Sequence, residues 1–142
     1  MGSRRNDKSL KVALTRLPAG LFSGLTVMAI LWLTLAPKPL GEETPSFFPG
    51  ADKVAHAIMF GGLVWMLIFD WQRKQRWIPA SFWLSINCAA LSSIFGCVIE
   101  FLQASMGMGR GFEFFDIVAD TVGSFLFAFL WLILQKFWTT FH

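Results

Sequence analysis

The chain has 142 residues, of which 55% are hydrophobic and 15% are charged, and its formal net charge is +3. A soluble domain carries about 25% charged residues, and the apolar residues here fall in long uninterrupted blocks, so a soluble fold is disfavoured. The basic residues lie beside apolar segments, which favours anchoring of membrane helices over nucleic-acid binding. The composition predicts one integral membrane domain over residues 1–142.

The first apolar block predicts a membrane-spanning helix at about residues 17–36. It follows a basic N-terminal segment, but at about 20 residues it is longer than the apolar region of a signal peptide. No small-residue cleavage site follows it. Pro37 and Pro39 end the block, because proline cannot continue a helix. We therefore interpret this block as a retained helix.

Three further apolar blocks predict helices at about residues 53–70, 78–104 and 114–138. The first of these is short, and it needs Asp52 in its first turn to span a membrane, where the helix dipole favours a negative charge. Pro79 is expected in the first turn of the next helix, a position that proline tolerates well. The predicted fold is all-α, an antiparallel bundle of four transmembrane helices.

The basic residues that flank the helices predict their orientation. Nine lie in the N-terminal segment, the middle loop and the C-terminal segment: Arg4, Arg5, Lys8, Lys11, Arg16, Arg73, Lys74, Arg76 and Lys136. Only three, Lys38, Lys53 and Arg110, lie in the other two loops. Because cytoplasmic loops carry the excess of lysine and arginine, both termini are expected in the cytoplasm.

Polar residues gather at the opposite, outer ends of the predicted helices. They come from three regions: Asp52, Lys53 and His56, then Glu100 and Gln103, and last Arg110, Glu113, Asp116 and Asp120. An antiparallel bundle brings these regions to the same membrane face. Ionisable residues at this density in apolar sequence are costly, and by default they mark a functional site.

The spacing of these residues predicts which of them share a helix face. Asp52 and His56 are four residues apart, which would let the aspartate orient or charge the imidazole. Glu113, Asp116 and Asp120 form a ladder on the last helix, with Asp120 roughly 6 Å deeper than Asp116.

Small and polar residues also recur at steps of three and four along the third helix. They are Ala89, Ser92, Ser93, Gly96, Glu100 and Gln103. Such a stripe is typical of a face that packs against other helices rather than lipid.

The outer residues favour two kinds of site equally. In an enzyme, His56, Glu100 and Asp116 would be the catalytic groups, as nucleophile or general base. The remaining six would contact the ligand: Asp52, Lys53, Gln103, Arg110, Glu113 and Asp120. In a binding module the same residues would hold an amphiphile without chemistry. A small transporter and a purely structural network are the further alternatives, so the sequence leaves open whether the chain is an enzyme.

The metal content of this site is also left open. Zinc is disfavoured, because the outer residues include one histidine and no cysteine. Carboxylate-bound Mg²⁺ or Ca²⁺ is compatible with the residues. A cation would also reduce the repulsion between the acids and a phosphate that Lys53 or Arg110 would hold.

The outer residues resemble the motifs of the VanZ-like family of small bacterial membrane proteins. The resemblance rests on Asp52-Lys53-x-x-His56, on Glu100-x-x-Gln103, and on Arg110 with Asp116 and Gly123. Asp120 stands where asparagine is expected in this family, and Phe60 where tyrosine is usual.

This resemblance implies a four-helix protein of the bacterial cell membrane, the inner membrane where there are two. It implies a link, through the founding members, to low-level resistance to glycopeptide antibiotics such as teicoplanin. Membrane lipids, a lipid-linked cell-wall precursor or a lipoglycopeptide antibiotic are the partners that would suit an outer-leaflet polar site. The oligomeric state is not predicted.

Overall fold

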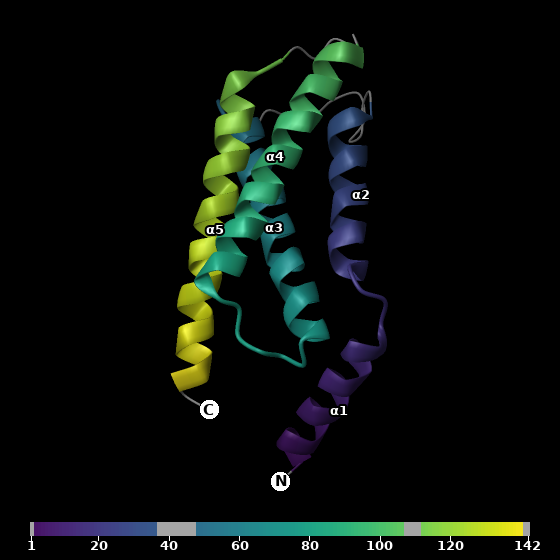
Figure 1. Ribbon diagram of the computed structural model, residues 1–142. Helices are drawn as coiled ribbons and strands as arrows, with labels where there is room; N and C mark the ends of the chain where they lie inside the picture. Colours follow the sequence, from purple (N-terminus) through teal and green to yellow (C-terminus); the bar gives the residue numbers. More distant parts are fainter. Residues whose placement is uncertain (1, 37–47, 107–111, 141–142) are drawn as a thin grey trace.

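All the secondary structure that the computed structural model describes is helical. It describes residues 2–36, 48–106 and 112–140, and side chains for residues 9–36, 48–106 and 112–137. The helices are α1 (Gly2–Arg16), α2 (Leu21–Leu35), α3 (Ala51–Lys74), α4 (Phe82–Met106) and α5 (Phe114–Thr140). Helices α2 to α5 run alternately up and down, and α1 projects from the end where α5 finishes (Figure 1). The predicted all-α fold is confirmed, while the orientation in the membrane stays a prediction.

Three of the described helices are long and apolar enough to cross a membrane: Ala51–Lys74, Phe82–Met106 and Phe114–Phe137. Helix α2 has 15 residues, fewer than the about 20 that cross a bilayer. Helices α1 and α2 pass the same test only together, and they are bent by 62°. By length and composition the described chain therefore has three spans, or four if the bent pair forms one.

The N-terminal part of the chain differs most from the prediction. A helix at 17–36 is wrong at its start, because α2 begins at Leu21, and the prediction missed α1 altogether. Pro18 and Gly20 separate the two helices, and Gly20 has a φ of 72°, a conformation that glycine adopts most readily. Helix α1 carries too many polar residues to give an apolar block, so hydropathy did not signal it.

The α3–α4 connection corrects a second boundary. Pro79 lies outside α4, not in its first turn, because α4 begins at Phe82. Ser81 caps it: its Oγ accepts a hydrogen bond of 3.1 Å from the backbone N–H of Leu84. Helix α3 extends to Lys74, one turn beyond the predicted end at residue 70.

Close backbone packing holds α3 against α5 where the outer residues converge. A Cβ added at Gly123 in α5 would overlap the backbone of Ala57 in α3. Two apolar clusters complete the interior. One contains Val64, Ile68, Ala80, Cys88, Ala89 and Ala128, and the other contains Ile30, Phe60, Leu63 and Ile99.

A buried ion pair fixes the bend between α1 and α2 onto the end of α3. The Arg73 guanidinium is fully buried and donates to Asp70 Oδ1 at 2.6 Å. It also donates to the backbone carbonyls of Leu14, Leu17 and Pro18 at 2.7, 3.0 and 2.7 Å. The other oxygen of Asp70 accepts hydrogen bonds from the N–H and the hydroxyl of Ser23. We call Ser23, Asp70 and Arg73 with these carbonyls the Arg73 cluster.

Candidate functional site

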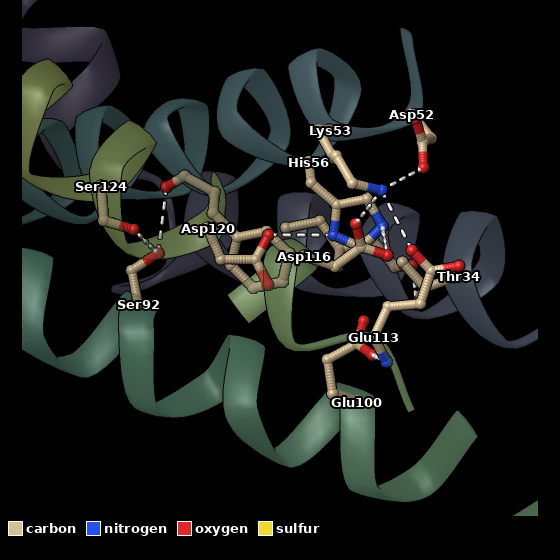
Figure 2. A network of polar contacts seen from close by, with 12 residues as sticks. Thr34, Asp52, Lys53, His56, Ser92, Glu100, Glu113, Asp116, Asp120 and Ser124 are labelled. Atoms are coloured by element: carbon tan, nitrogen blue, oxygen red, sulfur yellow. Dashed lines mark hydrogen bonds and ion pairs between the residues drawn. The ribbon is translucent and has the colours of Figure 1, made fainter. Parts of the chain in front are cut away.

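Polar side chains from three helices meet at the end of the bundle opposite the Arg73 cluster, and Figure 2 shows how they point toward one another. We call this group the acidic cluster. It contains Asp52, Lys53 and His56 from α3, Glu100 from α4, Glu113 just before α5, and Asp116 and Asp120 from α5. The structure thus brings together seven of the nine residues that the sequence singled out. The convergence of three separate regions, predicted from an antiparallel bundle, is present.

Lys53 links the outer rim of the cluster. Its Nζ lies 2.7 Å from Asp52 Oδ2, 3.0 Å from Glu113 Oε2 and 3.2 Å from Asp116 Oδ1. The side chains of Asp52 and Glu113 are each 56% exposed and that of Lys53 is 35% exposed, so this rim is open at the surface of the protein. The ammonium group already faces three carboxylates, and the rim as a whole is acidic.

His56 occupies the next layer, between two aspartates of α5. Its Nδ1 lies 2.9 Å from Asp120 Oδ1, and its Nε2 lies 3.9 Å from Asp116 Oδ2. The spacing in the sequence suggested Asp52 as the partner of the imidazole. That assignment is wrong, because Asp52 contacts Lys53 and the carboxylate that orients His56 is Asp120. An ionised Asp120 can only accept, so Nδ1 carries the hydrogen, and in the neutral imidazole Nε2 then carries the lone pair.

Two carboxylates form the buried floor of the cluster, and each keeps an oxygen with no partner. Glu100 is 1% exposed and Asp120 is fully buried. Glu100 Oε2 accepts a hydrogen bond of 3.1 Å from the backbone N–H of Glu113. Within the described part of the chain, Glu100 Oε1 and Asp120 Oδ2 accept none. Buried polar atoms are nearly always paired, so these two oxygens indicate capacity for a ligand.

Small residues of α4 make room beneath this floor. A Cβ added at Gly96 would press against the Asp120 carboxylate. Next to it the Ser124 hydroxyl donates to Ser92 Oγ at 3.0 Å, and Ser92 donates to the backbone carbonyl of Phe60 at 3.0 Å. Most of the predicted stripe is buried: Ala89, Ser92, Gly96, Glu100 and Gln103. The prediction of a helix-packing face is confirmed at these positions.

The other two predicted site residues have different outcomes. Gln103 Nε2 donates to the backbone carbonyl of Thr34 at 2.8 Å, so it joins α4 to α2. Arg110 lies outside the described residues, and its predicted role in the site stays a prediction.

Two groups of three residues within the described chain have the spacing of metal ligands. One is His56, Glu100 and Asp116, whose ligand atoms lie within 4.8 Å of one another. The other, at the exposed rim, is Asp52, Glu113 and Asp116.

Comparison with known proteins identifies the family. A family model described as VanZ/LLP1 matches residues 22–135. The chain belongs to the VanZ-like family. The match runs from α2 to near the end of α5 and includes every residue of the acidic cluster, so the predicted resemblance is confirmed. Comparison with curated proteins and with solved structures gives no match. A VanZ-like chain with three or four candidate spans is a membrane protein.

The two departures from the expected VanZ-like pattern both contact His56. Asp120 binds its Nδ1. The ring of Phe60 stacks against the imidazole with centroids 6.2 Å apart and planes inclined by 17°. Where the family resemblance leads us to expect asparagine and tyrosine, the histidine here contacts a carboxylate and a phenyl ring.

The sequence interpretation missed the Arg73 cluster. It assigned Arg73 to the basic middle loop, where charge serves only to orient the helices, and it gave Asp70 no role. Their separation of three residues at the end of an apolar block was the available signal, because such a pair shares a helix face. The partners of Arg73 are mostly backbone carbonyls across a bend, which no residue pattern encodes.

Proposed function

We propose that this VanZ-like protein binds the polar headgroup of a cell-envelope amphiphile at the acidic cluster, from the outer half of the membrane. The observation that carries the proposal is Glu100. Its carboxylate is buried in a membrane protein, yet Oε1 has no hydrogen-bond partner among the described residues. Leaving a buried charged group short of partners is costly, and a ligand that donates to it would remove that cost.

The charge of the cluster indicates the part of the headgroup that enters it. Among the described residues of the cluster, five carboxylates face one lysine and one histidine: Asp52, Glu100, Glu113, Asp116 and Asp120 against Lys53 and His56. Ionised carboxylates only accept hydrogen bonds. The site therefore favours a headgroup that donates, through an amine, an amide or hydroxyl groups. Membrane lipids, lipid-linked cell-wall precursors and lipoglycopeptide antibiotics all carry such groups.

The gradient of exposure supports entry from the membrane surface. The rim formed by Asp52, Lys53 and Glu113 is partly exposed, whereas Glu100 and Asp120 at the floor are buried. A headgroup entering along this gradient keeps its acyl chains in the bilayer. Binding of this kind would change envelope composition or drug access, which is how the proposal accounts for glycopeptide resistance in the family.

A headgroup-modifying enzyme is the second candidate, and the array around His56 favours it. Asp120 holds Nδ1 at 2.9 Å, which leaves Nε2 available to take a proton, with Asp116 Oδ2 at 3.9 Å. An imidazole oriented by a carboxylate is a recurring general base. Incubation with labelled lipids separates the candidates, because only an enzyme returns a changed headgroup.

Native mass spectrometry of the purified protein tests the binding proposal with three lipids of different headgroup. Phosphatidylethanolamine offers an amine, phosphatidylglycerol offers hydroxyls, and phosphatidic acid offers mainly phosphate. We expect the first two to be retained more strongly than phosphatidic acid. Glu100→Gln should weaken their retention at least tenfold, corresponding to about 1.4 kcal/mol, because the ligand loses a charged acceptor.

A serine on the same helix provides the matched control for that substitution. Ser105 is exposed, and among the described residues its hydroxyl bonds to the Leu102 carbonyl of its own helix. Ser105→Ala should therefore bind all three lipids as the unmodified protein does. Equal retention by Glu100→Gln, or preference for phosphatidic acid, would count against the proposal.

Thiol labelling of intact cells tests the side of the membrane on which the site lies. With Cys88 and Cys97 replaced by serine, Gly41→Cys should react with an impermeant reagent from outside. Gln75→Cys, in the α3–α4 connection at the opposite end of the bundle, should react only after lysis. The reverse pattern would place the acidic cluster on the cytoplasmic side and remove the cell-envelope proposal.

A further inference from the structure

Three side chains from three helices converge in the buried half of the acidic cluster at the spacing of ligands to one ion. Ligand atoms of His56, Glu100 and Asp116 lie within 4.8 Å of one another, and His56 Nε2 lies 3.9 Å from Asp116 Oδ2. That separation is too long for a hydrogen bond. Two ligands that share one ion at about 2.0–2.4 Å each lie roughly 3–4.8 Å apart. We propose that these three residues hold one divalent metal ion.

Glu100 supplies an observation that does not depend on the spacing. It is 1% exposed, and its Oε1 has no hydrogen-bond partner among the described residues. A buried charge is normally paired or bound to a metal. Lys53, the lysine of the rim, contacts Asp52, Glu113 and Asp116 instead. A metal ion beside His56 would give the buried carboxylate its counter-charge.

His56 is already oriented as a metal ligand. Asp120 accepts from Nδ1 at 2.9 Å, which leaves the lone pair of Nε2 directed to the side where Asp116 lies. Metal-binding histidines commonly donate their other ring N–H to a carboxylate, which fixes the tautomer and raises ligand basicity. Asp120 is thus a positioning residue for the metal, and Phe60, stacked on the ring, limits its rotation.

The donor set indicates the chemical class of the ion. Ca²⁺ takes oxygen ligands, so the imidazole argues against it. Zn²⁺ in a structural site prefers four ligands rich in cysteine and histidine. One imidazole with two carboxylates is a mixed set that suits Mn²⁺, and Zn²⁺, which binds such ligands more tightly than Mn²⁺, is a competitor. Three protein ligands would leave coordination positions open for water or a ligand group.

This metal site and the proposed headgroup site share the unpaired oxygen of Glu100, and a bound metal ion would extend what the cluster accepts. A bound dication offsets two of the negative charges around His56. A phosphate, which the acids otherwise repel, would then find an open coordination position. The same headgroup site would in that case respond to the metal content of the medium.

Electron paramagnetic resonance of the purified protein, free of added lipid, tests the proposal with Mn²⁺ alone. The signal of free Mn²⁺ should fall until one ion is bound per chain, and Zn²⁺ should displace it. Glu100→Gln and His56→Gln should each weaken Mn²⁺ binding at least tenfold, because each removes one of three protein ligands. Asp52→Asn and Glu113→Gln, at the exposed rim, should change it less than threefold.

A pulsed measurement on the unmodified protein keeps the test valid if a variant fails to fold. Bound Mn²⁺ should show a nitrogen hyperfine coupling from the imidazole of His56. Three results would each overturn the proposal. They are the absence of stoichiometric Mn²⁺ binding, bound Mn²⁺ that shows no nitrogen coupling, and a loss of Mn²⁺ binding in Glu113→Gln alone. Repeating the lipid measurement with a chelator separates the two hypotheses. Retention that survives the chelator supports headgroup binding even where Mn²⁺ does not bind.

Discussion

The two ends of the bundle bury charge in opposite ways. At one end the Arg73 guanidinium is fully buried, and both of its terminal nitrogens donate to Asp70 or to backbone carbonyls, so that only Nε lacks a partner. At the other end Glu100 and Asp120 are equally buried, yet each keeps an oxygen without a hydrogen-bond partner in the described chain. Buried charge therefore does not by itself indicate a ligand site. Unused acceptor capacity does, because a structural network tends to satisfy its own groups.

Arg73→Ala should have the largest effect on stability and tests the Arg73 cluster directly. It removes the partner of a buried carboxylate and the guanidinium donor of the Pro18 carbonyl, while the Leu14 carbonyl keeps only the backbone N–H of Leu17. Breaking a buried ion pair from one side costs about 3–5 kcal/mol. Chemical unfolding in detergent micelles should show a loss of that size.

Lys74→Ala is the control for that measurement. Lys74 is exposed and also donates to backbone carbonyls of the α1–α2 bend, at 3.2 and 2.6 Å. Exposed interactions contribute about 0–1 kcal/mol, so the unfolding free energy should hardly change. Equal losses of unfolding free energy in the two variants would mean that burial of the Arg73 cluster does not increase its contribution to stability.

Asp70→Asn and Glu100→Gln are both isosteric substitutions, and together they compare the effect on stability of neutralising a buried carboxylate at each end of the bundle. Asp70 accepts three hydrogen bonds, one of them from a guanidinium, and bonds to charged groups contribute about 1.5–3 kcal/mol. Its neutralisation should therefore lower the unfolding free energy by about 2 kcal/mol. Glu100→Gln removes a buried carboxylate that has a hydrogen-bond partner among the described residues for only one of its two oxygens. The unfolding free energy should therefore fall by less than about 1 kcal/mol, while lipid binding weakens at least tenfold. A larger loss of stability from Glu100→Gln than from Asp70→Asn would contradict the assignment of a structural role to the Arg73 cluster and a binding role to the acidic cluster.

The sequence predicted the acidic cluster far better than the Arg73 cluster, and the reason is physical. His56, Glu100 and Asp116 stand out because each interrupts apolar sequence, and alternating helix directions suffice to bring them together. Arg73 lies in a run of basic residues, where the same charge is expected at any membrane interface. The role of Arg73 depends on the bend at Gly20, where backbone carbonyls accept its hydrogen bonds. Side-chain types in the sequence do not reveal such backbone acceptors.

Within the acidic cluster, spacing on one helix proved a weaker guide than convergence between helices. Asp52 and His56 share a face of α3, but across the interface Asp120 lies closer to the imidazole. Gly123 explains how α5 comes so near, since its lack of a side chain lets the backbones of α3 and α5 meet. The stripe on α4 was predictable for the same reason, because small residues at helical spacing mark close packing.

Gly123→Ala tests whether that close approach builds the site. The added Cβ would overlap the Ala57 backbone, and overpacking of this kind costs about 1–3 kcal/mol. Because the same displacement would separate His56 from Asp120, lipid binding should fall together with the unfolding free energy. Gly62→Ala is the control, since a Cβ there meets nothing within 4 Å. Intact binding in a destabilised Gly123→Ala protein would show that the site tolerates a wider helix spacing.

Asp120→Asn should have the smallest effect and separates orientation of His56 from charge. The asparagine carbonyl still accepts from Nδ1, although a neutral bond is roughly half as strong as a charged one, so the unfolding free energy should change by less than about 1 kcal/mol. Asparagine is also the residue expected here in VanZ-like proteins. Asp120→Ala, in contrast, leaves the buried imidazole N–H without an acceptor, which costs about 1–3 kcal/mol. Lipid binding measured for both variants should persist in the first and weaken in the second. If both lose binding equally, the negative charge of Asp120, rather than its hold on the histidine, is what the ligand requires.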